Sequence, residues 1–338
     1  MISTALAAWS SAAASQANVS NIAPRVDSAT GEILDIHDGT TLRIGDTFYW
    51  YGAGYGGCTE QATGCANSQI GHCGFQMNHT VNVASSTNLV NWTFEGTALT
   101  MEDRPEGVLF SPWVARSNET GLYVMWTNVL PVTAGVADFQ KARYTVATSV
   151  SPAGPFKTVV ENVTGLVYGH LPDAASILFD AADGAGYVLF THETSHINHV
   201  QKLTGDLLGP VVPSQVSEQV GPGGNEGAVL FQRNGLYYAA YGACCCFCGA
   251  GADVTYYVSS NPLGPYALGG TIVEAADWHA QTGSIYYTGA DWVLYGDRYQ
   301  SAPDHIKGHD FSYMTPLAFD DAGVIAKLSW QDSVLIEY

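Results

Sequence analysis

The chain has 338 residues, of which 46% are hydrophobic and only 13% charged, so a large packed core is expected and extended disorder is excluded. Its 12 basic residues against 31 acidic ones give a net charge of -19, which repels phosphate backbones and anionic bilayers. Nucleic acids and membranes are therefore excluded as partners, and a neutral ligand is favoured.

Residues 1–20 are apolar and rich in small side chains, which predicts a signal-peptide remnant or a disordered N-terminus ahead of a single domain over residues 21–338. Five Asn-x-Ser/Thr acceptor sites follow along the chain. They lie at Asn18, Asn78, Asn91, Asn118 and Asn162. Because such sites are glycosylated in secreted proteins, we expect an extracellular glycoprotein.

The seven cysteines fall into two groups, Cys58, Cys65 and Cys73, then Cys244, Cys245, Cys246 and Cys248. In an oxidising compartment they predict up to three disulfides and one remaining thiol, with the connectivity open. A zinc site is the alternative, but it needs two separated ligand pairs, and no such spacing is present. The Gly-rich loop over residues 54–73 is then expected to form a disulfide-bonded wall of the substrate pocket.

A two-strand unit recurs five times, each copy with a polar head, an apolar strand, a turn and a second, aromatic strand. The copies span residues 37–52, 111–126, 173–190, 225–242 and 280–297. A second element, a Ser-rich strand end followed by a turn and an aromatic residue, recurs over 84–94, 147–159 and 258–268. No stretch of helical length shows a 3.6-residue period.

This spacing predicts an all-β chain folded as a five-bladed β-propeller with four strands in each blade. A two-sheet sandwich is the alternative, but it would need no fixed interval between the units. In a propeller the first strand of each blade lines the central channel, so the heads of the five units should meet at one mouth.

Three heads carry acids: Asp38, Asp173 and Glu226. Carboxylates brought together raise the pKa of at least one of them, which suits glycoside hydrolysis, where one carboxylic acid protonates the leaving oxygen and one carboxylate activates water. Asp38 and Asp173 could also have purely structural roles. Asp38 precedes Gly39 in a turn-like pair, and Asp173 follows Pro172 and would cap a strand.

The unit at residues 225–242 resembles the general-acid blade of the glycoside hydrolase family 43 propellers, in which a Glu-Gly start leads into an apolar strand and an Asn-Gly hairpin. The units at 37–52 and 173–190 are similar to that family's first and third blades, and the unit at 111–126 resembles its second blade. The resemblance implies that Glu226 is the general acid, Asp38 the base of an inverting displacement, and Asp173 the residue that tunes and orients Glu226.

The fifth unit departs from the family pattern, because Ala280-Gln281 replaces the Gly-His that often faces the channel. Gln281 and the Gly-Asp-Arg-aromatic strand that ends at Tyr299 look more like the fungal exo-β-1,3-galactanase subgroup, whose members lack the usual base. By their positions in the repeat, Trp113, Gln281 and Arg298 are expected to bind substrate. His37, beside Asp38, is expected to bind substrate or to hold the base, with a purely structural histidine as the alternative. No cofactor is implied, although a structural calcium ion occurs in the channel of this family.

The resulting prediction is a secreted, monomeric, inverting and exo-acting glycosidase of plant or fungal cell-wall polysaccharide. Its substrate would be β-1,3-galactan or arabinogalactan, or glycans that carry arabinose or xylose. Two alternatives remain open: a propeller that binds glycans without cleaving them, and a retaining furanosidase of the invertase type. The second would need an Asn-Asp-Pro-Asn-Gly nucleophile motif, which is absent.

Overall fold

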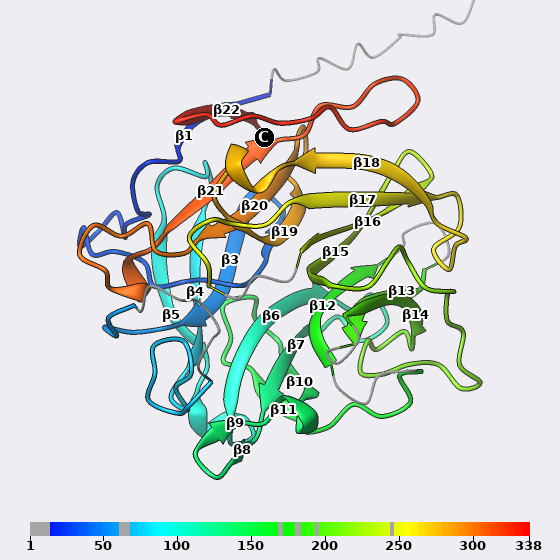
Figure 1. Cartoon of the computed structure of the whole chain (residues 1–338), viewed down its shortest axis with the longest axis horizontal. Helices are drawn as coiled ribbons and strands as arrows, with labels where there is room; N and C mark the ends of the chain where they lie inside the picture. Colours follow the sequence, from blue (N-terminus) through cyan, green and yellow to red (C-terminus); the bar gives the residue numbers. More distant parts are fainter. Residues whose placement is uncertain (1–13, 61–67, 168–171, 180–183, 193–195, 244–246) are drawn as a thin grey trace, which may run out of the picture.

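A computed structural model describes residues 14–60, 68–167, 172–179, 184–192, 196–243 and 247–338, without the side chains of residues 172–175 and 179. Within these ranges the main strands form five antiparallel sheets around a central axis, which confirms the predicted five-bladed β-propeller (Figure 1). Helical structure there is limited to 3-10 turns: η1 (Met101–Asp103), η2 (Phe139–Lys141), η3 (Ala275–Asp277) and η4 (Lys307–His309). No helix in the same ranges is long and apolar enough to cross a membrane.

The blades follow one another along the chain. Blade one contains β2 (Thr41–Ile44), β3 (Thr47–Gly54), β4 (Thr80–Ser86) and β5 (Thr93–Leu99). Blade two contains β6 (Val108–Arg116), β7 (Tyr123–Leu130), β10 (Arg143–Ser149) and β11 (Lys157–Val160), with the small hairpin β8 (Val132–Thr133) and β9 (Val136–Ala137) between β7 and β10. Blade three contains β12 (Pro172–Phe179), β13 (Gly186–His192) and β14 (Ile197–Leu203). Blade four contains β15 (Asn225–Arg233), β16 (Leu236–Ala243), β17 (Val254–Ser259) and β18 (Ala267–Val273). Blade five contains β19 (Gln281–Tyr287), β20 (Trp292–Arg298) and β21 (Phe311–Pro316).

Blades three and five have three strands in the described ranges, where the repeat predicted four. In blade three the segment after β14 makes only isolated bridges to it, such as Gln201 with Val216 and Leu203 with Pro210. Pro210 and Pro213 lack the N–H group that a regular ladder requires, so this edge stays irregular.

The hairpin of β15 and β16 matches its prediction closely. Arg233 pairs with Leu236, which leaves Asn234 and Gly235 as a two-residue turn, and both have positive φ, 50° and 79°. That conformation is the one that joins twisted strands with least distortion, and Asn-Gly adopts it readily. The apolar residues that follow Glu226 are buried, so the strand is held on both faces.

Every inner strand is irregular near its head. The pairing register shifts between Phe110 and Trp113 in β6, Pro172 and Ala175 in β12, Glu226 and Val229 in β15, and Thr282 and Ser284 in β19. Blade one shows the same shift, because His37 bridges Ala53 whereas Thr41 pairs with Trp50. A β-bulge bends the strand and re-aims its side chains, so five bulges surround the mouth of the channel.

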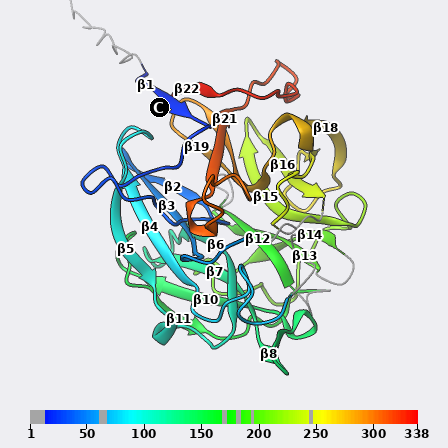
Figure 2. The same cartoon turned by 60° about the vertical axis from the view of Figure 1, so that its left-hand side comes forward.

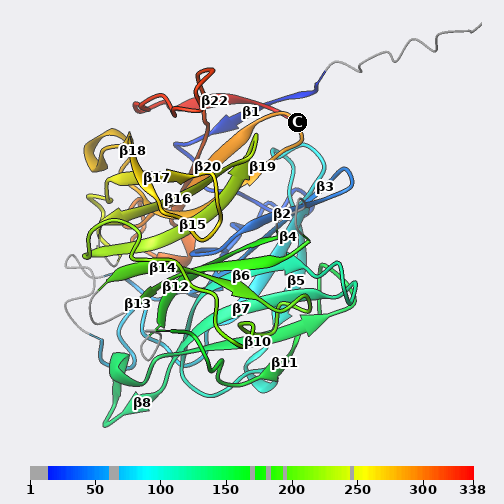
Figure 3. The same ribbon diagram turned by 90° about the vertical axis from the view of Figure 1, so that its right-hand side faces the viewer.

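The chain ends meet in a separate two-stranded sheet. β1 (Gln16–Ser20) pairs antiparallel with β22 (Ser333–Glu337), and Figures 2 and 3 show the two strands together at one end of the molecule. Ala17 and Val19 are buried in a cluster with side chains of blades one and five, among them Trp50 and Tyr295. The folded domain therefore begins before residue 21, the predicted boundary, because alternate residues of this short segment face the core.

Candidate active site

The heads of four blades line a small cavity at the channel mouth. Its lining residues are Asp38, Gly39, Ser111, Pro112, Trp113, Gly227, Ala228, Thr282 and Gly283. Most of them belong to the bulged stretches. A Cβ added at Gly227 would lie 2.7 Å from the carbonyl oxygen of Thr282, so glycine is required after Glu226 for blades four and five to approach this closely.

Glu226 and Gln281 meet across the junction of blades four and five. Gln281 Nε2 donates a hydrogen bond of 3.1 Å to Glu226 Oε2. Glu226 is 6% exposed, whereas Gln281 is only partly buried. The structure therefore brings the predicted acid and one predicted binding residue into direct contact at the mouth.

Asp38 is held by blade two. The backbone N–H and hydroxyl of Ser111 both donate to Asp38 Oδ2, at 2.8 and 3.1 Å. Asp38 and Ser111 have left-handed φ angles of 54° and 49°, a conformation that costs a non-glycine residue on the order of 1 kcal/mol. Burial and the charges of Asp297 and Glu226 raise the pKa of Asp38 to about 7, although the hydrogen bonds from Ser111 oppose the shift.

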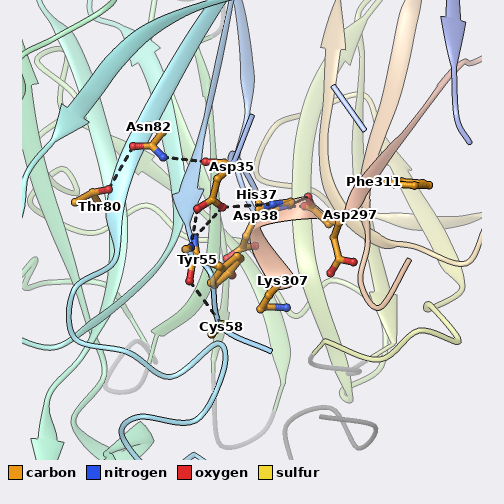
Figure 4. A network of polar contacts seen from close by, with 12 residues as sticks. Asp35, His37, Asp38, Tyr55, Cys58, Thr80, Asn82, Asp297, Lys307 and Phe311 are labelled. Atoms are coloured by element: carbon orange, nitrogen blue, oxygen red, sulfur yellow. Dashed lines mark hydrogen bonds and ion pairs between the residues drawn. The ribbon is translucent and has the colours of Figure 1, made fainter. Parts of the chain in front are cut away.

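His37 lies between the carboxylates of Asp35 and Asp297, next to Asp38 (Figure 4). Its Nδ1 is 3.3 Å from Asp297 Oδ1, and its Nε2 is 3.5 Å from Asp35 Oδ1. Burial lowers the pKa of the imidazole, but the hydrogen bond to Asp297 and the charges of Asp297 and Asp35 outweigh it, so the pKa is raised. His37 is 2% exposed, so it is buried next to Asp38 and does not lie on the open mouth.

The third predicted acid, Asp173, belongs by its backbone to β12, the inner strand of blade three. Its side chain lies outside the described residues, so its predicted role in tuning Glu226 stays a prediction.

Trp113 and Arg298 lie in different surroundings. Trp113 lines the cavity, but it is 8% exposed and its Nε1 donates to the carbonyl of Ile177 at 3.0 Å, which ties blade two to blade three. The Arg298 guanidinium donates to Asn21 O at 2.6 Å and lies 4.6 Å from the ring centroid of Trp330. The structure therefore does not bring Arg298 to the carboxylates, because the preceding residue, Asp297, takes the side of the strand that faces them.

The Gly-rich loop is covalently closed and anchored beside this network. Cys58 and Cys73 form a disulfide, and Cys248 is also disulfide-bonded, while Cys65 and residues 244–246 lie outside the description. Lys307 is 1% exposed; its Nζ lies 3.3 Å from Glu60 Oε1 and 3.9 Å from the ring centroid of Tyr299. Burial lowers the pKa of Lys307, although the charges of Glu60 and Asp310 oppose this. The loop and the η4 segment are thus joined by a buried ion pair.

The cavity at the heads does not suit calcium, which takes six to eight oxygen ligands. Asp38 is the single charged residue among those that line it. Elsewhere in the described ranges, no three His, Cys, Asp or Glu side chains are arranged to hold a metal ion.

Two residues of the site escaped prediction. The sequence marks Ser111 only as the head of its unit and Asp297 only as part of a Gly-Asp-Arg strand, and it predicts no site role for either residue. The available signal for Ser111 was its place in the repeat, which is equivalent to that of Asp38. For Asp297 it was the two-residue period of a strand, which places Asp297 and Arg298 on opposite faces.

The sequence pattern of glycosyl hydrolases family 43 matches residues 33–295 of the chain. Among solved structures, an exo-β-1,3-galactanase from Clostridium thermocellum is 23% identical with a TM-score of 0.75, covering 95% of this chain and 68% of that one. An exo-β-1,3-galactanase from Phanerochaete chrysosporium is 20% identical with a TM-score of 0.72, covering 94% and 67%. A family 43 β-1,3-galactosidase is 19% identical with a TM-score of 0.74, and this chain spans 64% of its length. No curated protein sequence matches the chain significantly.

Proposed function

The chain belongs to glycosyl hydrolases family 43, whose members are inverting glycoside hydrolases, and we propose that it removes galactose by exo action from β-1,3-linked galactan or arabinogalactan. One observation carries this proposal. Asp38 lines the cavity and Glu226 directly precedes Gly227, which also lines it; both acids stand at bulged strand heads, and each is held by a polar side chain of a different blade.

Glu226 is the general acid of this proposal. A glycosidic oxygen is a poor leaving group until it receives a proton, and a buried carboxyl at the end of a rigid strand can deliver one in a fixed direction. Gln281 restricts the carboxyl through its hydrogen bond to Oε2. Because Gln281 is partly exposed, its amide is also placed to contact the sugar.

Asp38 is the base. In an inverting displacement the base takes one proton from a water molecule while the oxygen of that water attacks the anomeric carbon from the face opposite the leaving group. Ser111 occupies Oδ2 of Asp38 with two donors, so Oδ1 is the oxygen left to accept from water. A base whose pKa is about 7 accepts that proton more strongly than an ordinary aspartate.

The choice of galactan depends on blade five and on the structural neighbours. Gln281 replaces the histidine common in the family, and the three neighbours described above are named as β-1,3-galactanases or a β-1,3-galactosidase. The disulfide-bonded loop between β3 and β4 of blade one supports a closed pocket and hence exo action. Release of arabinose or xylose is the alternative within the same mechanism.

Secretion and glycosylation belong to the same proposal, with the enzyme acting as an extracellular monomer on cell-wall polysaccharide. The asparagines of all five acceptor sites are exposed. The disulfide between Cys58 and Cys73 is of the kind that persists in an oxidising compartment.

The test is to incubate the protein with β-1,3-galactan, arabinogalactan and aryl glycosides of galactose, arabinose and xylose. Product analysis should show free galactose from chain ends, and proton NMR of the first product should show inverted configuration. Glu226→Gln protein prepared in parallel controls for contaminating activity. Retained configuration would exclude the inverting mechanism, release of only arabinose or xylose would change the substrate, and binding without any product would identify a glycan-binding protein.

A further inference from the structure

Asp297 is a buried carboxylate that reaches from blade five into the first blade. It lies on β20 and is 1% exposed. Its Oδ2 accepts the backbone N–H of Asp38 at 2.9 Å, and its Oδ1 accepts the hydroxyl of Tyr295 at 2.8 Å and faces His37 Nδ1 at 3.3 Å. Figure 4 shows Asp297 and His37 meeting next to Asp38.

Asp297 binds Asp38 through its backbone N–H, so the carboxyl of Asp38 stays available to other partners. The left-handed φ of 54° turns the N–H of Asp38 toward Asp297, while its side chain points to Ser111. Such a backbone conformation persists in a non-glycine residue only when the surroundings hold it from several sides. Here blade five holds the N–H and blade two holds the carboxyl.

His37 completes the arrangement from the other side of Asp297. It is the residue before Asp38, and its ring stands between Asp297 and Asp35. Asp35 is itself fixed by the backbone N–H groups of Tyr55 and Gly56, at 2.9 and 2.6 Å. Two consecutive residues of blade one are therefore bound to one carboxylate of blade five.

We propose that Asp297 is a positioning residue for the base: it fixes Asp38 at the mouth of the channel, and its negative charge sets the pH range over which Asp38 takes a proton from water. The proposal rests on the proposed function, in which Asp38 is that base. Asp297 touches neither sugar nor water in it and acts only through Asp38.

The charged and titratable groups around Asp38 allow this assignment to be separated from other effects. Asp297 faces it from blade five and Glu226 from blade four, and both raise its pKa, whereas Ser111 of blade two lowers it. Tyr55 and Tyr299 also interact with Asp38, and burial raises the pKa of each hydroxyl well above its usual value, so both stay neutral. The side chain of Asp173 lies outside the described residues.

The experiment compares the pH dependence of kcat/KM for the wild type, Asp297→Asn and Asp297→Glu. Removing the charge lowers the pKa of Asp38, so the acid limb of the Asp297→Asn profile should move to lower pH by about one unit. Asp297→Glu keeps the charge but displaces the N–H of Asp38, so its limb should stay in place while kcat falls about tenfold. Asp46→Asn, which removes a fully exposed charge paired with Arg43, is the control and should leave the profile unchanged.

Thermal unfolding of each variant establishes that it is folded, and Asp297→Ser replaces Asp297→Asn if the amide prevents folding. An acid limb that stays put in the uncharged variants, or that moves equally in Asp297→Glu, would overturn the proposal for Asp297. Failure of the proposed function has a different signature, because Asp38→Asn would then retain full activity whatever the Asp297 variants do.

Discussion

The heads of blades one and four each present one carboxyl group to the channel, yet they hold it differently. In blade four the left-handed residue of the bulge is Gly227, with φ of 62°, and Glu226 precedes it. In blade one the left-handed residue is Asp38 itself. Equivalent bulges therefore place the carboxyl-bearing residue on relaxed backbone in blade four and on strained backbone in blade one.

This difference matches the roles of base and acid proposed for Asp38 and Glu226. Asp38 has a short side chain, two donors from Ser111 on one oxygen and its N–H bound to Asp297, so it has little freedom. Glu226 has a longer side chain whose hydrogen bond to Gln281 restrains one oxygen. A base must hold water in line with the anomeric carbon, whereas an acid must follow the leaving oxygen as the bond breaks.

The largest effect is expected from Glu226→Gln, which removes the transferable proton and keeps the shape. The rate on galactan should fall by about 10²–10⁴-fold, and much less on a dinitrophenyl galactoside, whose leaving group needs no proton. Steady-state rates on the two substrates give the comparison, with exposed Glu218→Gln as the control. Equal losses on both substrates would argue against Glu226 as the acid.

Asp38→Asn should lower the rate on both substrates by about 10²–10³-fold, since water then lacks its base. Azide attacks without losing a proton, so it should restore turnover to Asp38→Asn on the dinitrophenyl galactoside and yield the galactosyl azide of inverted configuration. The same azide should not rescue Glu226→Gln on galactan. If azide rescues neither variant, the two heads do not divide the roles of acid and base.

The same Asp38→Asn change should alter stability in a pH-dependent way. The pKa of Asp38 is about 7 in the fold against 3.8 for an ordinary aspartate, so the folded state binds the proton more tightly between these values. The free energy of unfolding from this group is therefore highest below pH 4 and is lost as pH rises through 7. Thermal melts should show a larger Tm gain for Asp38→Asn over the wild type at pH 8 than at pH 4, and an equal gain at both would contradict the raised pKa.

Gln281→Ala removes the restraint on Glu226. A side-chain hydrogen bond is worth about 0.5–1.5 kcal/mol, so kcat should fall about two- to tenfold, with the protein still folded. Gln232→Ala, at the other end of the Glu226 strand, is the matched control and should change nothing. An unchanged kcat in Gln281→Ala would mean that Gln281 does not orient the acid.

Ser111→Ala should have the smallest effect and act only on the other head. Loss of its hydroxyl removes a bond that lowers the pKa of Asp38, so the acid limb of kcat/KM should move to higher pH by about one unit or less. The control is Ser85→Ala, which breaks an exposed hydroxyl bond to Glu95. A shift toward lower pH would contradict the role given to Ser111.

The regular hairpins of this fold can be predicted from the sequence because each one contains its own turn residues and alternating apolar residues. The unit at 225–242 needed no tertiary information, since Asn234-Gly235 determines the register. The irregular parts depend on neighbours. In the described ranges, blades three and five lack the predicted fourth strand, and in blade three Pro210 and Pro213 interrupt the ladder in a segment outside the repeated units.

The candidate site likewise contains residues that the repeat indicates and residues that only the tertiary structure reveals. The repeat aligns the heads, so it predicts that Asp38, Glu226 and Gln281 lie near one another at the mouth, and their catalytic and binding roles are proposals. The Gly-Asp-Arg motif does not distinguish Arg298 from Asp297, because adjacent strand residues look equivalent in a motif although they face opposite sides. The burial of Lys307 against Glu60 joins segments far apart in the chain, so sequence reasoning had no route to it.

The pairing of β1 with β22 has a consequence for how the ring assembles. Gln16 and Glu337 are hydrogen-bonded across 321 positions of sequence, whereas each blade is built from neighbouring hairpins. Blades can therefore form one after another as the polypeptide leaves the ribosome, but the seam between the first and the last stays open until β22 emerges. A circular permutant that links Ser15 to Tyr338 and opens the chain between two other blades would make this slowest contact local, and it should refold faster than the parent.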